Sequence, residues 1–484
     1  MKKLIALLLV AVMALSLFAA CNKTPDPTDA PKATDAPKAT DAPKATDAPA
    51  ATDAADADPY AWIIDEDMKD YKGQVKFWNA LGYTGQLENF IAEFNAIYPN
   101  IEVIYNKFDN GSDGNVALTT AMMSGECDVV CSFGLNNAYP RWENGLYVDI
   151  TEKCKEEGID LIENWGTDLY TYEGKIYTFP AAGLNYYIAI NMDKWNAAGL
   201  GELPTEWTWD EYMAACKAMT EVDEKGEVVV YGGSDFHSTN YWTYPGVQVD
   251  GANPYYNADG TAQFDDPVNV AALKREYQAE VVDKIWFPKT RYNADNIRAY
   301  ATFCNGNVAS TIITNVELYL HRTDLYPNVD WVTGFAPYPV NEKGQTNYMS
   351  GVAPFSHVGI SANCQDETAA WLFLKWFATY GIKYHLTSGH RPSWTGTPAG
   401  LAYDMLYGEN GAEVAPKYLD TESFERVCGN TALPAFIEDE MTGYSAMGSL
   451  ITEYTMMALS GEMSVEDAIA ALDKEAEQAI LDAK

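Results

Sequence analysis

Apolar residues recur with two different periods along residues 74–133, which indicates strands separated by helices. Residues 74–78 (QVKFW) alternate like a short strand, and residues 101–106 and 128–133 (DVVCSF) indicate two more. Between the first two, the apolar residues that share one helical face are Leu87, Phe90, Ile91, Phe94 and Ile97. Residues 116–125 indicate a second helix. This succession predicts an α/β fold with a largely parallel sheet.

A second cycle of the same kind begins at Ile188 (IAINMDKW). Thr208 and Glu211 have the spacing of a helix capping box, and residues 228–233 (VVVYGG) indicate a strand. Residues 268–281, residues 366–380 and a segment that begins at Ser464 are predicted helices. Residues 309–320 (ASTIITNVELYL) have the character of a strand that crosses back towards the first cycle.

The first 20 residues are predicted to be a signal peptide. Two lysines precede an apolar stretch over residues 4–20, which is shorter than the roughly 20 residues of a membrane-spanning helix. The four residues before Cys21 (LFAA) resemble the lipobox of bacterial lipoproteins. That resemblance implies cleavage before Cys21 and lipid on its thiol and new amino terminus. Ordinary secretion with an incidental cysteine is the alternative.

Residues 21–60 repeat the phrase T-D-A-P-K-A. Regular prolines block helix growth, and the segment has too little apolar surface to offset the entropy of ordering. It is predicted to be a disordered stalk, which would span roughly 90 Å if it were extended as polyproline II.

Charge, cysteines and histidines narrow the function further. The net charge of −37 argues against nucleic acid as a partner, because that binding relies on cationic contacts. Seven cysteines follow Cys21, an odd number that suggests no complete disulfide framework, and Cys127 and Cys131 are expected to be small buried residues. The five histidines form no zinc motif. No cofactor and no metal are expected.

The body resembles extracellular solute-binding proteins of family 1, which include maltose-binding proteins and serve ABC importers. Its phrases VKFWNALG, WENGLYVDIT, IAINMDKWNAAGL, PTEWTWDEY and AAWLFLKWFA carry this resemblance by their order and spacing. The resemblance implies the two-lobed α/β periplasmic-binding-protein fold of type II, with a ligand held in the cleft by hinge closure. One lobe would be residues 61–183 plus 316–365, and the other residues 188–312 plus 366–484. Crossings are expected near residues 183–187 and 314–317.

Ligands of open α/β sheets bind beyond the carboxyl ends of the strands, which selects the loops that carry candidate site residues. The resemblance places the positions near Phe133, Asn136, Tyr241 and Glu317 close to the family's sugar contacts. Trp242 and Trp394 are the preferred stacking platforms, and Tyr186 and Tyr244 lie in the same loops as other candidates. Packing, turn capping or structural ion pairs are the alternative roles. The predicted ligand-binding residues are Trp78, Asn79, Tyr83, Phe133, Asn136, Asn185, Tyr187, Tyr241, Trp242, Glu317, Arg391 and Trp394.

Aromatic faces cover the apolar patches of sugars, while amides and charged groups bind the hydroxyls. The expected function is therefore a monomeric, non-enzymatic lipoprotein on the outer face of the cell membrane of a single-membrane bacterium. It would capture a carbohydrate, an oligosaccharide by preference, and deliver it to ABC permease subunits, with the lipid as its only membrane contact. A peptide, glycerol phosphate or polyamine ligand on the same fold is one alternative. A surface carbohydrate-active enzyme, which would need two suitably spaced carboxylates, is the other.

Overall fold

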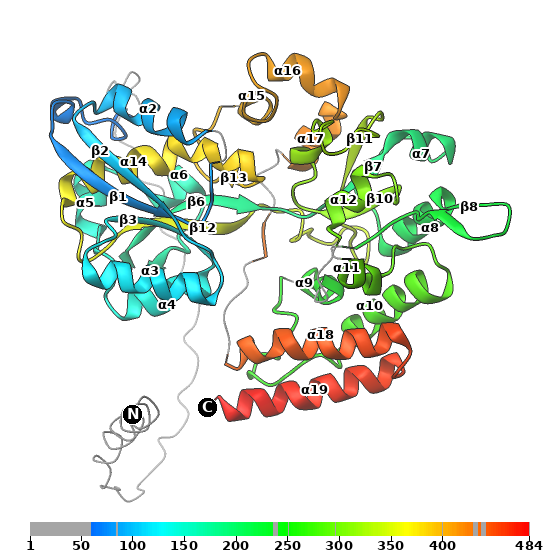
Figure 1. The fold of residues 1–484 in the computed structure, drawn as a ribbon. Helices are drawn as coiled ribbons and strands as arrows, with labels where there is room; N and C mark the ends of the chain where they lie inside the picture. Colours follow the sequence, from blue (N-terminus) through cyan, green and yellow to red (C-terminus); the bar gives the residue numbers. More distant parts are fainter. Residues whose placement is uncertain are drawn as a thin grey trace, which may run out of the picture. The chain divides into compact units, whose positions relative to one another are not determined.

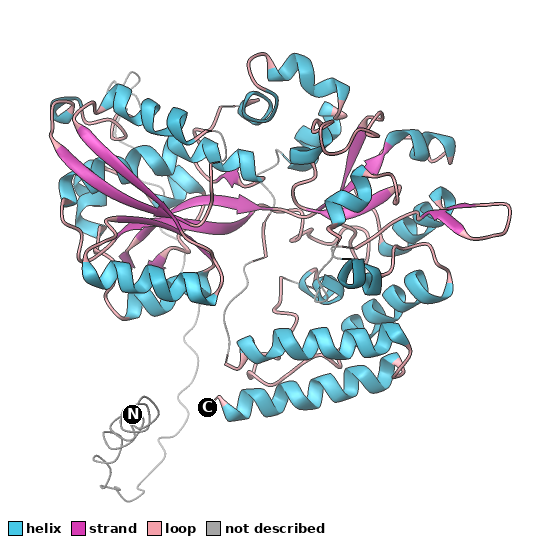
Figure 2. Ribbon diagram, in the orientation of Figure 1, coloured by secondary structure: helices cyan, strands magenta, loops and turns pink. Residues whose placement is uncertain are grey.

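The computed structural model describes residues 60–83, 86–235, 241–249, 251–295, 297–398, 400–428, 434–436 and 442–483. The predicted signal peptide, Cys21 and residues 22–59 of the predicted stalk lie outside these ranges. The described residues all belong to one unit, residues 58–484. In that unit the structure contains two main sheets, which Figure 2 shows in magenta.

The larger sheet has six strands in the order β13-β6-β12-β3-β1-β2. The strands are β1 (Gly73–Asn79), β2 (Ile101–Lys107), β3 (Val129–Phe133), β6 (Thr178–Leu184), β12 (Ala353–Ile360) and β13 (Arg391–Pro392). β1 pairs in parallel with β2 and β3, whereas β12 is antiparallel to β3 and β6, and β13 is antiparallel to β6. The predicted largely parallel arrangement therefore holds in strand direction for β1, β2, β3 and β6, whereas β12 and β13 run the opposite way. β12 runs in the opposite direction because the chain returns to this sheet at the edge where β6 leaves it.

Alternate residues of the larger sheet contribute to two different hydrophobic layers. Val129 and Cys131 of β3 belong to the layer that contains α2 (Leu87–Ile97) and α14 (Glu367–Thr379). Val130 belongs to the opposite layer with α3 (Ser112–Ser124) and α4 (Leu135–Glu143) (Figure 1). This alternation follows from the two-residue period of a strand. It explains why β3 has no polar face: helices cover both sides of it.

Helix α14 packs on β1, β6 and β12. All of its residues from Ala369 to Thr379 are buried, which accounts for its nearly continuous apolar sequence. Each large side chain buried in this way stabilises the fold by about 2 kcal/mol. The predicted boundary, which assigned residues 366–484 to the second lobe, is therefore wrong for α14 and β13. Both follow β12 closely enough in the chain to stay with its sheet.

The smaller sheet is antiparallel, in the order β10-β7-β11. β7 (Tyr187–Asn191) pairs with β10 (Ser310–Ile313) on one side and with β11 (Thr333–Pro337) on the other. The predicted crossing at residues 314–317 is wrong, because the chain turns there into α13 (Glu317–Leu320) and continues to β11 in the same sheet. It returns to the larger sheet only between β11 and β12, and it leaves again after β13.

The two faces of β7 also belong to different clusters. Ile188 and Ile190 pack with the buried aromatic residues of α7 (Met192–Ala197) and α8 (Trp209–Met219). Tyr187 and Ala189 pack towards α12 (Ala299–Cys304), α13 and α17 (Thr421–Cys428). The capping box predicted at α8 is confirmed: Glu211 N–H donates to the Thr208 hydroxyl, and Thr208 N–H donates to the Glu211 carboxylate.

The chain ends in two helices that pack against each other, α18 (Tyr444–Ser460) and α19 (Val465–Asp482) (Figure 1). Ser464 caps α19 by accepting a hydrogen bond from Asp467 N–H, as its position in the sequence predicts. Ile451, Ile469 and Leu472 of this pair form a cluster with Phe264 and Leu273.

The remaining elements are short or lie at the periphery of the two sheets. They are η1 (Glu66–Met68), α5 (Thr151–Glu157), α6 (Leu161–Trp165), β4 (Thr171–Tyr172), β5 (Lys175–Ile176), β8 (Glu221–Val222), β9 (Val228–Val230), η2 (Tyr241–Thr243), α9 (Tyr244–Val247), α10 (Pro267–Tyr277), η3 (Gln278–Val282), α11 (Lys289–Asp295), η4 (Gly381–Ser388), α15 (Leu401–Tyr407), α16 (Gly411–Val414) and η5 (Ala415–Lys417). Within the described part of the chain, no helix has the length and apolar character needed to cross a membrane. Cys127 and Cys131 are buried free thiols, which confirms their expected packing role.

Candidate functional site

Strands of both sheets have their carboxyl ends next to the segment of chain that passes from one sheet to the other. β1, β2, β3 and β6 run in one direction, so their carboxyl ends lie at the same edge of the larger sheet. Residues 185–186 connect that edge to Tyr187, which pairs with the last residues of β10 and β11. A Cβ on Gly183 would lie 2.6 Å from the Ala353 carbonyl oxygen, which explains the glycine just before this connection. Edges of this kind are where α/β proteins bind ligands.

Four of the predicted site residues form one buried polar network at this connection. Arg391 Nε donates to Asn185 Oδ1 at 3.1 Å, and Arg391 Nη2 lies 3.1 Å from Glu317 Oε1. The Tyr187 hydroxyl donates to the other oxygen of Glu317 and accepts from Val316 N–H at 3.1 Å. Asn185 Nδ2 donates to the Val427 carbonyl at 3.0 Å. The network joins β13 of the larger sheet to β7 and α13 of the smaller one.

The charges of Glu317 and Arg391 in this network neutralise each other. Burial raises the pKa of the Glu317 carboxyl, and the neighbouring Arg391 guanidinium offsets part of that rise. Both side chains are almost fully excluded from solvent. A buried ion pair is retained only when its remaining hydrogen bonds are satisfied, as they are here. Asn185, Tyr187, Glu317 and Arg391 therefore hold the connection together, and their polar groups are occupied by one another.

An aromatic group lies at the edge of the larger sheet, where β3 ends and β12 begins. The rings of Phe133 and Phe355 are stacked with their centroids 4.9 Å apart, and the His390 ring meets them edge-on at 5.2 and 5.3 Å. Burial lowers the pKa of His390 to about 4, so its imidazole is neutral at physiological pH. Phe355 and His390 were not predicted, although His390 directly precedes the predicted Arg391.

Asn79, at the carboxyl end of β1, is fully buried. Its Oδ1 accepts from Leu81 N–H at 3.1 Å, while its Nδ2 has no hydrogen-bond partner within the described part of the chain. Asn79 stays a predicted ligand-binding residue, but no part of it reaches solvent.

Three tyrosines form a second aromatic group, at the edge of the smaller sheet. The Tyr186 ring lies 5.4 Å from the rings of both Tyr241 and Tyr244, and the last two rings lie 4.6 Å apart. The hydroxyls of Tyr186 and Tyr241 are 3.3 Å apart. Tyr186 comes from the connection itself, whereas Tyr241 and Tyr244 begin η2 and α9. Tyr186 and Tyr241 remain partly exposed.

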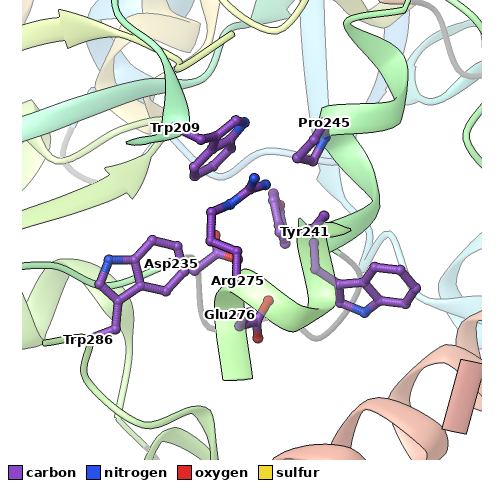
Figure 3. A pocket seen from close by; sticks show the side chains of 9 residues that line it. Trp209, Asp235, Tyr241, Pro245, Arg275, Glu276 and Trp286 are labelled. Atoms are coloured by element: carbon purple, nitrogen blue, oxygen red, sulfur yellow. The ribbon is translucent and has the colours of Figure 1, made fainter. Parts of the chain in front are cut away.

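A narrow pocket lies beside this group and shares Tyr241 with it (Figure 3). The space between its lining atoms is about 210 Å³, part of which is open to solvent, and its interior has room for about one water-sized group. Its lining residues are Trp209, Asp235, Tyr241, Trp242, Pro245, Ala272, Arg275, Glu276 and Trp286. The sequence interpretation missed all of them except Tyr241 and Trp242, because Arg275 and Trp209 lie on helices whose pattern shows only helical periodicity.

The carboxylates of this pocket are bound to a buried lysine. Lys289 Nζ lies 2.9 Å from Asp235 Oδ2 and 2.6 Å from Glu276 Oε1, and Lys289 N–H donates to Glu280 at 2.9 Å. Burial raises the pKa of Glu276 to about 7, although Lys289 opposes this shift. Among the described residues, no group of three or more His, Cys, Asp or Glu side chains could hold a metal ion.

Other predicted site residues belong to the protein core. Trp394 is buried against Tyr60 and Tyr380, with ring centroids 5.0 and 5.3 Å away, so it does not offer a free face for stacking. Tyr83 is buried against Phe90 at 4.8 Å. Both lack the exposed ring that their predicted role requires.

Two more predicted aromatic residues are held by hydrogen bonds. Trp242 is buried and donates its indole N–H to Thr455 at 2.8 Å, although one part of it lines the pocket. Trp78 donates its indole N–H to the Glu126 carbonyl at 2.9 Å and is half-buried on β1. Asn136 lies in α4, and its side chain is outside the described part of the structure.

A family model described as bacterial extracellular solute-binding protein matches residues 79–383. The chain belongs to this family. The resemblance to maltose-binding proteins inferred from the sequence is confirmed. A comparison with curated protein sequences gives no match.

Solved structures share the fold of this solute-binding protein. An ABC substrate-binding protein from Listeria monocytogenes in complex with cycloalternan is 18% identical with a TM-score of 0.63, covering 84% of this chain and 99% of that chain. Maltose-bound MalE3 from T. maritima is 19% identical with a TM-score of 0.60 and the same coverage. The GacH receptor of Streptomyces glaucescens, determined unliganded and with acarbose, is 17% identical with a TM-score of 0.61, covering 86% and 100%. The α/β periplasmic-binding-protein fold of type II is thereby confirmed.

The chain is thus a non-enzymatic solute-binding protein of an ABC transporter, from a family that is extracellular or periplasmic. A small-molecule ligand and permease partners follow from that membership.

Proposed function

We propose that this solute-binding protein captures a carbohydrate, an oligosaccharide by preference, at the connection between its two sheets. The observation that carries the proposal is the pair of aromatic groups at the two sheet edges: the half-buried Phe355, stacked on the buried Phe133, on one, and the partly exposed Tyr186 and Tyr241 on the other. Such faces cover the apolar C–H surface of sugar rings, and nearby amide and hydroxyl groups bind the hydroxyls. The solved relatives bound to cycloalternan, maltose and acarbose support a sugar ligand.

Capture would occur by hinge closure between two lobes. We place the first lobe at residues 60–184 plus 353–398 and the second at residues 187–337 plus 400–483, because this division follows the sheets and their hydrophobic layers. Residues 185–186 and 338–352 would then be hinge segments. A few such residues absorb the backbone rotation when lobes close on a ligand.

The lipid anchor is the second part of the proposal. Lipid on Cys21 would hold the protein on the outer face of the membrane, and residues 22–60 would act as a tether to the permease. A tether of this kind raises the effective concentration of captured solute near its transporter. A monomer suffices for this role.

Charged ligands have less support at the hinge. Glu317 and Arg391 are the charged groups that a polyamine or a glycerol phosphate would use, but they are bound to each other. A ligand that is uncharged where it meets this pair leaves the pair intact, which favours the carbohydrate over both alternatives.

Isothermal titration calorimetry of the purified mature protein against neutral mono- and oligosaccharides tests the proposal. Replacing Tyr241 by Ala should abolish sugar binding while the protein still unfolds cooperatively. Tyr300→Ala is the matched control, since Tyr300 is also half-buried and stacks on Tyr319 at 3.8 Å. If peptides or polyamines bind and no sugar does, the carbohydrate assignment is wrong.

A further inference from the structure

Arg275, on α10, presents hydrogen-bond donors that the protein does not use. Its guanidinium carbon lies 4.2 Å from the centroid of the Trp209 ring, a cation–π contact that fixes the plane of the group. Among the described residues, the Arg275 side chain takes part in no hydrogen bond or ion pair, while its backbone carbonyl accepts from Gln278 N–H. An arginine has five N–H donors, so this half-buried side chain keeps donors that solvent or a ligand can bind.

A second unmet donor lies beside it. Trp209 is buried, and its indole Nε1 has no hydrogen-bond partner in the part of the chain that the structure covers. Figure 3 shows the Arg275 guanidinium beside the Trp209 ring that carries this nitrogen. Two neighbouring donor groups without acceptors match a ligand group that only accepts hydrogen bonds.

The nearby carboxylates do not supply that acceptor, because they serve Lys289. Asp235 and Glu276 contact Lys289 Nζ, and their attraction outweighs the effect of burial and raises the pKa of Lys289. For Arg275 the balance is reversed: burial outweighs the attraction of the surrounding groups and lowers its pKa to about 10. The lysine is fully compensated by negative charge, whereas the arginine is not.

We infer that Arg275 and the indole N–H of Trp209 form an anion-binding subsite that accepts a carboxylate carried by a sugar ligand. This inference rests on the proposed carbohydrate function and narrows it to acidic sugars, those that contain a uronic acid. The planar guanidinium matches a carboxylate with two parallel hydrogen bonds.

The position of the pocket fits that assignment. Tyr241 lines the pocket and also packs against Tyr186. A sugar ring that lies on those tyrosines places its acidic substituent next to Arg275.

The test measures the affinity of the mature protein for three ligands by calorimetry. They are a neutral disaccharide, the uronic-acid disaccharide of the same linkage and the corresponding sugar phosphate. The uronic acid should bind at least about tenfold more tightly than its neutral counterpart, a difference that one charge-assisted pair supplies. The preference should weaken as salt is raised, which is measured on the unmodified protein. Tighter binding of the sugar phosphate would overturn the carboxylate assignment.

Three variants test whether Arg275 causes the preference for the acidic sugar. Arg275→Gln should remove the preference for the acid and leave neutral binding unchanged, and Arg275→Lys should keep part of it. Arg291→Gln is the control, because Arg291 lies 4.7 Å over the Phe287 ring but is half exposed and paired with Asp295 at 3.5 Å. Equal weakening of neutral and acidic sugars by Arg275→Gln would overturn the subsite.

The same experiment separates failure of the subsite from failure of the proposed function. Neutral sugars that bind as tightly as acidic ones overturn the subsite alone. If no sugar binds but free glutarate or phosphate binds in an Arg275-dependent manner, the anion site is supported and the carbohydrate proposal is wrong. If neither sugars nor free anions bind, both are wrong.

Discussion

Arg391 and Glu317 form a buried ion pair, with 3.1 Å between Nη2 and Oε1, that links β13 of the larger sheet to α13 beside the smaller sheet. The two residues are 74 positions apart in the chain. Arg391 also donates to Asn185, which lies in the connection between the sheets. The pair therefore helps to hold the two sheets in their relative positions, and it also stabilises the structure around it.

Removing one partner of this pair should destabilise the protein more than removing both. Glu317→Gln leaves the Arg391 guanidinium buried without a counter-charge, which should lower the free energy of unfolding by about 3 kcal/mol. The double variant Arg391→Met with Glu317→Leu should lose less than Glu317→Gln alone. Urea denaturation of the purified proteins measures both differences.

Lys383→Met is the matched control for the buried pair. The Lys383–Glu93 ion pair is partly exposed, and exposed pairs contribute about 1 kcal/mol or less. If Lys383→Met lowers the free energy of unfolding as much as Glu317→Gln does, burial gives the ion pair at the connection no special role.

Trp394→Ala should reduce stability without changing ligand binding, whereas Tyr241→Ala should mainly reduce ligand binding. Trp394 is buried against Tyr60 and Tyr380, so its truncation should lower the free energy of unfolding by about 3–5 kcal/mol and leave the ligand affinity of the folded fraction unchanged. Tyr241 is partly exposed, and its truncation should mainly weaken binding. Denaturation measures the stability of each variant, and calorimetry on the same preparations measures its ligand affinity. If Trp394→Ala weakens binding, Trp394 belongs to the ligand site after all.

Local signals in the sequence were sufficient to predict single elements. The capping residues Thr208 and Ser464 begin helices as predicted, and the apolar periods place β1, α2, β2, α3 and β3 within a few residues of their observed bounds. Side-chain period and capping chemistry depend only on near neighbours. They carry no information on strand direction, so β12 and β13 could not be recognised as antiparallel and the crossing at residues 314–317 was misplaced.

The candidate site was only partly predictable for a related reason. Trp394 and Tyr241 both lie in stretches of sequence rich in polar residues, and their different burial depends on partners such as Tyr60 and Tyr186, which are distant in the chain. Glu317 and Arg391 were both predicted to bind the ligand, but nothing local shows that they pair with each other. Arg275 lies on a helix where an arginine is ordinary, and it becomes a candidate only because its side chain makes no hydrogen bond or ion pair with another described residue.

Stability should decrease in mild acid because of buried neutral histidines. His357 is fully buried among Trp142, Tyr147 and Tyr170, and burial, reinforced by the Arg141 charge, lowers its pKa from 6.5 to about 3. Between these pH values the unfolded chain binds a proton that the folded protein does not, so the free energy of unfolding falls as pH falls. At pH 5 one such histidine costs about 2 kcal/mol.

His357→Leu isolates this contribution from that of the many carboxylates. The loss of unfolding free energy between pH 7.5 and pH 5.0 should be smaller in the variant than in the unmodified protein by about 2 kcal/mol, because all other groups titrate alike in both. Urea denaturation at the two pH values gives the comparison. An equal loss in both proteins would show that His357 is protonated without penalty in the folded state.

Cys21→Ser should release the protein from the membrane. Each buried lipid methylene contributes about 0.8 kcal/mol, so acyl chains on Cys21 would account for stable anchoring, and the serine variant would have none. Fractionation of cells and medium should show the unmodified protein with the membrane and the variant in the medium, and mass spectrometry should show the lipid. Cys154→Ser, a change at a buried thiol of α5, should leave membrane association unaltered. Equal membrane association of Cys21→Ser and the unmodified protein would favour ordinary secretion with an incidental cysteine.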